Sequence, residues 1–295
     1  MYKKNWSIFT TILIFPYALI YIGNALVSTE NLALLVLGAL ITIVGFVLSV
    51  VAYTSLVKSV HDLETNPSAI VSVKDQYSFG FKIFWSVILV GIIQALVSFG
   101  SLALFLIPAI IVGVYVTFSY FGVVLDGKKG FSALTESFSL VRGRWWKILW
   151  RIIFVALVNL LLSVVIMGIQ FLLSSLTGYQ HNSSTDIMVS SILNMILVLF
   201  YMPIGVAYLY KLYRTLKETE VAEISTVVFK RWLVTFLVVG IVAIVMLPVF
   251  VVTVIGSSVR ARQAAIEAVM RAKAQQDAIQ QEISGQQAPA GSTTQ

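Results

Sequence analysis

Long apolar runs alternate with short polar segments along the chain up to about residue 255. A helix needs about 20 mostly apolar residues to cross a bilayer. Seven runs qualify, and they cover residues 8–27, 32–57, 83–106, 108–125, 148–176, 187–210 and 232–255. Residues 92–111 lack the alternation of a membrane β-strand, and lipid does not tolerate open sheet edges. The pattern predicts an all-α fold, a polytopic transmembrane helix bundle of about seven spans, or six if 232–255 does not cross completely.

Aromatic and basic residues are grouped at the start of four of these runs. Tryptophan settles at headgroup level and lysine keeps its ammonium in water, so such groups are typical of membrane-interface anchors. The groups are Tyr2-Lys3 with Trp6, Phe81-Lys82 with Trp85, Trp146-Lys147 with Trp150, and Phe229-Lys230 with Trp232. We expect the interface anchors to be Trp6, Trp85, Trp145, Trp146, Trp150 and Trp232.

The positive charges fall on alternate connections between the runs. The connections at 28–31, around Gly100 and at 177–186 carry no lysine or arginine, whereas the intervening ones carry all sixteen that precede Arg260. The positive-inside rule then predicts a plasma-membrane protein with a cytoplasmic N-terminus and, for seven spans, an extracytoplasmic C-terminus. Four later basic residues oppose that C-terminal location: Arg260, Arg262, Arg271 and Lys273.

The polar connections on the basic side are predicted to contain short amphipathic interfacial helices. Asn66-Pro67 suits the start of a helix that runs towards Tyr77. Residues 131–142 form a second helix that ends near Gly143, and a weaker amphipathic pattern lies at 214–230. Apolar residues at helical spacing define one face of the second helix: Phe131, Leu134, Phe138 and Val141.

The composition changes after the last apolar run. Alanine, glutamine and alternating charges continue to Ser284, and a Pro/Gly/Ser/Thr-rich end follows. This predicts two parts, a transmembrane domain over 1–257 and a C-terminal helical stalk with a disordered tail over 258–295.

Composition limits the classes of function. The chain has 295 residues, of which 59% are hydrophobic and only 11% charged, and it has no cysteine. Soluble proteins have roughly 25% charged residues, so this balance fits an integral membrane protein. The net charge of +7 follows from the membrane topology, and no nucleic-acid partner is expected. The absence of cysteine excludes disulfides and thiolate metal sites.

Catalytic and metal-binding patterns are missing from the sequence. No glycine-rich phosphate loop, HExxH, GxSxG or pair of carboxylates on one helical face occurs. In the predicted topology His61 and His181 lie on opposite sides of the membrane, where each is interpreted as a solvated loop residue. The sequence therefore predicts no enzyme, no metal and no cofactor.

A basic cluster around 126–151 is the candidate site. An interfacial helix followed by cations would present them to phosphate headgroups, and each basic residue near an anionic surface contributes about 1 kcal/mol. We expect binding of an anionic lipid headgroup, or of a partner protein, by Lys128, Lys129, Arg142, Arg144, Lys147 and Arg151. The alternative is a connector that only sets the angle between two spans.

Transport through the bundle is the alternative function. No acid, lysine or histidine lies near the middle of a predicted span, so a transporter or channel would take a neutral or hydrophobic substrate. A water-accessible cavity lined by Gln94, Asn159 or Asn194 would favour it, whereas hydrogen bonds between helices would make these amides packing residues.

About fifty residues, from Leu104 to Phe154, resemble a bacterial family, the membrane domain of glycerophosphoryl diester phosphodiesterase, and related uncharacterised multi-pass proteins. The resemblance rests on Ile107-Pro108, Asp126-Gly127, Ala133, Leu134 and Ser137, and on the stretch Arg142-Gly143-Arg144-Trp145-Trp146.

What the resemblance implies is a multi-pass architecture and at most an association with membrane lipid. The phosphodiesterase chemistry of such proteins belongs to a separate barrel domain with a His-Arg-Gly motif, which this sequence lacks. The expected function is that of a non-enzymatic membrane protein that engages anionic lipid or a partner, and a homo-oligomer remains open.

Overall fold

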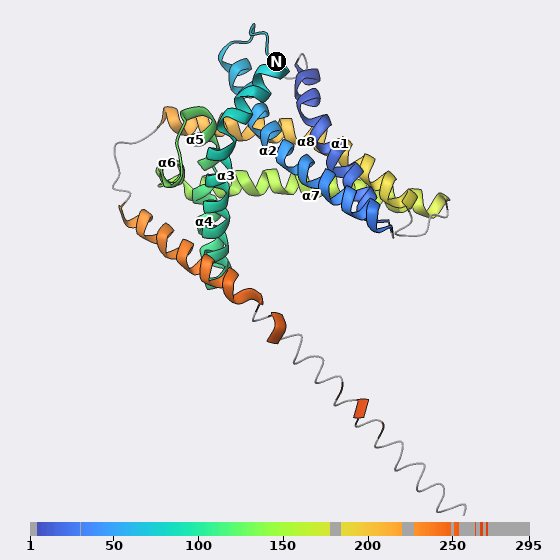
Figure 1. Cartoon of the computed structure of the whole chain (residues 1–295). Coiled ribbons are helices and arrows are strands. Elements are labelled where there is room, and N and C mark those ends of the chain that lie inside the picture. The colour runs from blue at the N-terminus through green and yellow to red at the C-terminus, as the bar shows by residue number, and fades with distance from the viewer. Residues whose placement is uncertain are drawn as a thin grey trace, which may run out of the picture. The chain divides into compact units, whose positions relative to one another are not determined.

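The computed structural model describes residues 5–29, 31–177, 184–219, 227–248 and 251–253, and the single residues 263, 266, 267 and 270. Within these ranges the regular elements are α-helices, and none of the described residues forms a strand. The labelled helices are α1 (Trp6–Val27), α2 (Leu32–Thr65), α3 (Val73–Leu104), α4 (Leu106–Val116), α5 (Ser119–Asp126), α6 (Phe131–Val141), α7 (Trp145–Thr177) and α8 (Ser184–Glu218). One more helix covers residues 227–248 (Figure 1).

The chain separates into two compact units, residues 1–240 and 241–295. The first unit holds the labelled helices, and the description below concerns this unit. The predicted domain boundary at 257 and the predicted helical stalk lie almost wholly outside the described residues. So do His181 and residues 220–226, the middle of the weak amphipathic pattern at 214–230.

Seven helices are long and apolar enough to cross a membrane, in agreement with the seven predicted runs. Their apolar side chains are largely exposed, and the most apolar stretch of α7 buries none of its residues against the protein. Soluble monomers rarely expose apolar patches of more than a few hundred Å². The exposed apolar surface therefore fits lipid, and the all-α, multi-pass prediction is confirmed by the helices themselves.

Small residues allow α1 and α2 to pack along their length as a hairpin (Figure 1). A Cβ added to Gly23 would lie 2.7 Å from the backbone oxygen of Gly38, and one added to Gly38 would lie 2.6 Å from the oxygen of Gly23. Such close approach of two backbones is typical of membrane helix pairs, where dispersion rather than water exclusion drives association.

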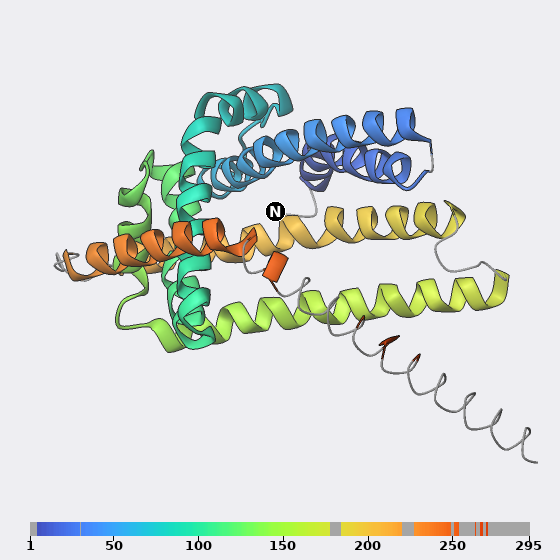
Figure 2. The same ribbon diagram turned by 60° about the horizontal axis from the view of Figure 1, so that its bottom comes forward.

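Helix α3 runs across α2 and α7 instead of alongside them, as both views show (Figures 1 and 2). Gly80 of α3 marks one crossing, because a Cβ there would meet the backbone oxygen of Val51 at 2.9 Å. Gly100 and Gly240 mark the contact of α3 with the helix 227–248. Glycine therefore allows close backbone approach at both of these contacts of α3.

The predicted span 108–125 agrees with the apolar segment Leu106–Asp126, and within it a turn at Thr117 and Phe118 separates α4 from α5. Ser137 of α6 stabilises this break. Its hydroxyl accepts a hydrogen bond from the Phe118 backbone nitrogen (3.0 Å) and donates one to the Tyr115 carbonyl (2.6 Å). A buried helix break leaves backbone groups without partners, and one fully buried serine supplies both a donor and an acceptor.

The predicted amphipathic helix at 131–142 is confirmed as α6. Its Ala133, Leu134 and Val141 are fully buried, in contacts with α3, α4, α5 and α8. The apolar face is thus covered by protein instead of facing lipid. Gly143 follows in the left-handed conformation with φ of 78°, as expected for a residue that ends a helix.

The predicted helix from Pro67 towards Tyr77 is wrong. Asn66 closes a turn, since its side-chain oxygen accepts from Ser68 N (3.1 Å) and its carbonyl from Ala69 N (3.0 Å). The helical hydrogen bonds do not continue beyond this turn, and α3 begins only at Val73.

Several basic residues that the sequence assigned to loops instead lie on extensions of the long helices. Helix α2 continues to Thr65, and α8 continues through Lys211, Arg214 and Lys217 to Glu218. The polar residues of these extensions are therefore helical. At the extended ends, α2 and α8 meet α5 and α6.

Candidate functional site

The six predicted cations do not form one cluster. Arg144, Lys147 and Arg151 line a shared pocket, Arg142 lines a different one, and Lys128 and Lys129 lie in the turn between α5 and α6. The basic segment is divided because Gly143 turns the chain sharply between Arg142 and Arg144.

The first pocket, which we name the α7–α8 basic pocket, has a volume of about 200 Å³. It forms where the start of α7 meets the end of α8, and none of its lining residues among those described is acidic. The lining residues are Arg144, Lys147, Ile148, Arg151, Thr215, Leu216 and Thr219. The three cations beside the apolar Ile148 and Leu216 are the donors that a phosphate group needs, whereas the two threonine hydroxyls already donate to backbone carbonyls of α8.

Arg144 holds the two helices together at this pocket. Its Nη1 donates to Thr219 Oγ1 (2.6 Å) and its Nη2 to the Thr219 carbonyl (2.5 Å). The final carbonyls of a helix lack partners within it and carry partial negative charge, so a guanidinium is favourable there. Lys147 and Arg151 are exposed on the next turn and a half of α7.

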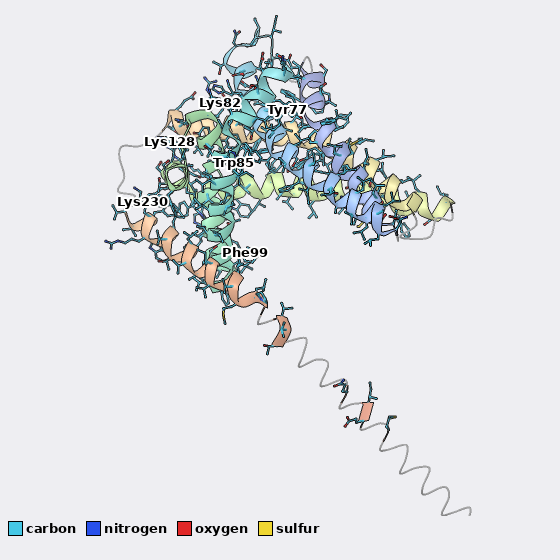
Figure 3. All side chains as sticks on the ribbon, viewed as in Figure 1. Tyr77, Lys82, Trp85, Phe99, Lys128 and Lys230 are labelled. Atoms are coloured by element: carbon cyan, nitrogen blue, oxygen red, sulfur yellow. The ribbon has the colours of Figure 1, made fainter. Side chains whose placement is uncertain are left out.

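Lys128 and Lys129 are exposed in a tight turn between Gly127 and Gly130, both of which have positive φ. Lys128 N donates to the Gly122 carbonyl at 3.1 Å, which ends α5. Figure 3 shows Lys128 at the end of the molecule formed by α5 and α6. Neither lysine is among the described residues that line the basic pocket.

A cluster that sequence reasoning missed joins α5, α6 and α8, and we name it the acid–lysine cluster: Asp126, Glu136, Tyr213 and Lys217. Lys217 Nζ lies 2.5 Å from Asp126 Oδ1 and 3.4 Å from Glu136 Oε1. The Tyr213 hydroxyl donates to Asp126 Oδ2. One lysine thus bridges two carboxylates on different helices.

Glu136 is the most enclosed member of the acid–lysine cluster. Its side chain is 14% exposed, and its Oε2 is buried without a hydrogen-bond partner among the described residues. Burial raises the pKa of the Glu136 carboxyl and the neighbouring Asp126 carboxylate raises it further, while Lys217 opposes both effects.

No local pattern could have predicted this cluster. Lys217 is 81 residues from Glu136 in the chain, and Glu136 is not among the residues that define the apolar face of the helix at 131–142. Only the family-like Asp126-Gly127 pair pointed at one member.

A polar pocket of about 320 Å³ adjoins the acid–lysine cluster. It includes His61, which the sequence analysis took for a solvated loop residue. His61 instead lies on α2, where its Nδ1 is 3.0 Å from the Tyr210 hydroxyl of α8. The extension of α2 brings the histidine to α8, so this prediction was wrong.

The tryptophans predicted as interface anchors fall into two groups. Trp85, Trp146, Trp150 and Trp232 are highly exposed, and Figure 3 shows Trp85 near Lys82 on α3. Trp6 instead packs against Phe200, with ring centroids 5.2 Å apart, and Trp145 Nε1 donates to the Ile111 carbonyl. The exposed four are accessible to a surrounding membrane, and their role as interface anchors stays a prediction.

Of the amides named in the sequence analysis, Gln94 forms a hydrogen bond between helices, as a packing residue does, whereas Asn194 bonds within its own helix. Gln94 Oε1 of α3 accepts from the Ser119 hydroxyl of α5 at 2.9 Å, and Asn194 donates to the Ser190 carbonyl of its own helix. Neither lines a pocket described here.

Comparison with protein families gives one match. The model of a domain of unknown function, DUF7847, covers residues 16–216, from α1 to the end of α8. No curated protein and no solved structure matches the chain. The matched range includes the α7–α8 basic pocket up to Leu216 and three of the four residues of the acid–lysine cluster.

Proposed function

Since this protein belongs to the DUF7847 family, whose function is unknown, we propose its role from the site itself: a non-enzymatic multi-pass membrane protein that binds anionic lipid headgroups in the α7–α8 basic pocket. The observation that carries the proposal is the set of Arg144, Lys147 and Arg151 around one pocket with no acid among its described lining residues. Arg144 is already held by Thr219, so part of the site is preorganised.

The location of the pocket supports a lipid over a soluble anion. It lies at the start of α7, whose following surface is apolar and exposed, and the exposed Trp146 and Trp150 flank the cations. A headgroup phosphate bound there would leave its acyl chains beside apolar side chains.

The residues that resemble the phosphodiesterase membrane domain have an architectural role in this proposal. Ala133, Leu134 and Ser137 are buried where α6 packs on α4 and α5. The signature residues therefore hold the helices, and the sequence has no His-Arg-Gly motif through which a phosphodiesterase activity could be proposed.

Replacing Arg144, Lys147 and Arg151 together with glutamine is expected to abolish selective retention of anionic lipid. Each cation contributes about 1 kcal/mol at an anionic surface, so the three together correspond to about a hundredfold in affinity. Native mass spectrometry of detergent-purified protein titrated with phosphatidylglycerol or phosphatidylcholine measures the loss.

The matched control replaces Lys74, Lys82 and Lys129 with glutamine, because this removes the same charge from residues that do not line the pocket. It is expected to keep the preference for phosphatidylglycerol. Equal lipid selectivity in the wild type and the first variant, or equal losses in both variants, would refute headgroup binding at this pocket.

The positive charges also support a topology with a cytoplasmic N-terminus and an extracytoplasmic C-terminus. A reporter fused after Ser284 is expected to show extracytoplasmic activity, and one fused after Glu218 to show cytoplasmic activity. A cytoplasmic signal from both fusions would instead require six spans or a re-entrant last helix.

A further inference from the structure

An apolar groove of about 770 Å³ lies between α4, α6 and the helix 227–248, apart from the α7–α8 basic pocket. Its α4 side includes Pro108, Ile111 and Tyr115, and Phe138 of α6 and Arg142, which follows α6, also line it. From the third helix come Val228, Phe229, Trp232 and Phe236. All of these residues belong to the compact unit 1–240.

Aromatic rings form a firm floor for this groove. Phe138 and Phe229 stack with centroids 3.8 Å apart, and Tyr115 lies 4.7 Å from Phe138 and 5.8 Å from Phe229. These rings come from three helices and fix one another, so the hollow beside them does not close by a simple change of side-chain rotamer. The exposed Ile111 and Trp232 leave the groove open to the surrounding lipid.

Among the described residues that line the groove, Arg142 is the charged one. Its guanidinium lies over the Phe138 ring, 5.9 Å from the centroid, and no acid among the described residues forms an ion pair with it. A cation at one end of an otherwise apolar, aromatic groove complements a molecule with an anionic head and an apolar chain.

We propose that this groove binds one anionic phospholipid, with an acyl chain against Tyr115, Phe138 and Phe229 and the phosphate on Arg142. The site is distinct from the α7–α8 basic pocket, because the two share none of their described lining residues. The lipid fills a space between helices instead of merely coating the surface.

The proposal is tested with a substitution that fills the groove. In Ile111→Trp the indole occupies space beside the aromatic floor, whereas Ile110→Trp adds the same group to a neighbouring exposed position that does not line the groove. Native mass spectrometry with phosphatidylglycerol is expected to show one tightly bound lipid fewer in the first variant and no change in the second.

The charge is tested with Arg142→Gln, for which Lys129→Gln is the control. We expect the first to lower the preference for phosphatidylglycerol over phosphatidylcholine about fivefold at the groove, and the second to leave it unchanged. Oleate and the chain-free headgroup glycerophosphoglycerol are the comparison ligands, and neither is expected to displace the bound phospholipid.

The results separate this site from the basic pocket. The variant with Arg144, Lys147 and Arg151 replaced is expected to keep the groove lipid, and Ile111→Trp is expected to keep the lipid of the basic pocket. Each proposal is therefore tested by its own variant and can fail without the other. If Ile111→Trp keeps every bound lipid, or if oleate displaces the phospholipid completely, the proposal is wrong.

Discussion

Replacing Gly100 with alanine is expected to push the helix 227–248 away from α3 and to destabilise their contact by about 1 to 3 kcal/mol. A Cβ at Gly100 would lie 1.8 Å from the Phe236 backbone oxygen and 2.7 Å from Gly240 N. Backbone atoms cannot move aside as a flexible side chain can, so the helices must separate. The other helix is equally close to α3, because a Cβ at Gly240 would lie 2.1 Å from the Leu96 oxygen.

The same substitution at Gly91, on the same helix, is the matched control. A Cβ there meets nothing within 4 Å, and alanine is the better helix former by up to about 1 kcal/mol. Gly91→Ala should therefore keep or slightly raise the unfolding temperature, whereas Gly100→Ala lowers it.

Spin labels report the separation directly, because the chain has no native cysteine to compete with engineered ones. Cysteines at the exposed Phe99 and Val238 carry the labels for electron–electron distance measurements. We expect a longer distance in Gly100→Ala and an unchanged one in Gly91→Ala. If neither variant changes it, close backbone contact does not hold this helix pair.

The second large effect is expected at Lys217. Lys217→Met leaves Asp126 and Glu136 without the cation that lies between them. Removing one partner of a buried ion pair costs 3 to 5 kcal/mol, but the Lys217 side chain is 38% exposed, so solvent screening reduces the expected loss to about 1 to 2 kcal/mol. Thermal unfolding in detergent at pH 8 measures it.

The loss should depend on pH in a defined direction. Burial and Asp126 raise the pKa of Glu136, so the folded protein holds this proton at pH values where the unfolded chain has released it. Stability from this group is therefore present at low pH and is lost as pH rises from about the unfolded value through the raised folded pKa. Lys217→Met is expected to be closer to the wild type at pH 5 than at pH 8.

Glu136→Gln provides the control for this assignment. It removes the titrating group while keeping a similar shape, so the fall in stability between pH 5 and pH 8 should become smaller. Combined with Lys217→Met, it should also relieve most of the destabilisation. An unchanged pH profile in Glu136→Gln would show that another group is responsible.

Much of the architecture could be predicted because membrane spans are encoded locally. About 20 consecutive apolar residues form a helix in lipid whatever their neighbours do, since every backbone group must find its partner within the segment. The same local rule predicted α6, whose apolar residues recur at helical spacing and whose end is marked by Gly143. The three predicted cations Arg144, Lys147 and Arg151 meet because two helical turns of α7 bring them to one face.

The sequence by itself therefore determined that this is an all-α membrane protein with seven long apolar helices. Only the tertiary structure decided which side chains meet between them: the contact of Gly100 with Gly240, the serine that supports the α4–α5 break, and the bridge from Lys217 to two acids. The physical reason is the separation along the sequence of the residues that interact. Helix formation depends on neighbours a few residues apart, whereas these contacts join helices far apart in sequence and depend on how closely the backbones approach.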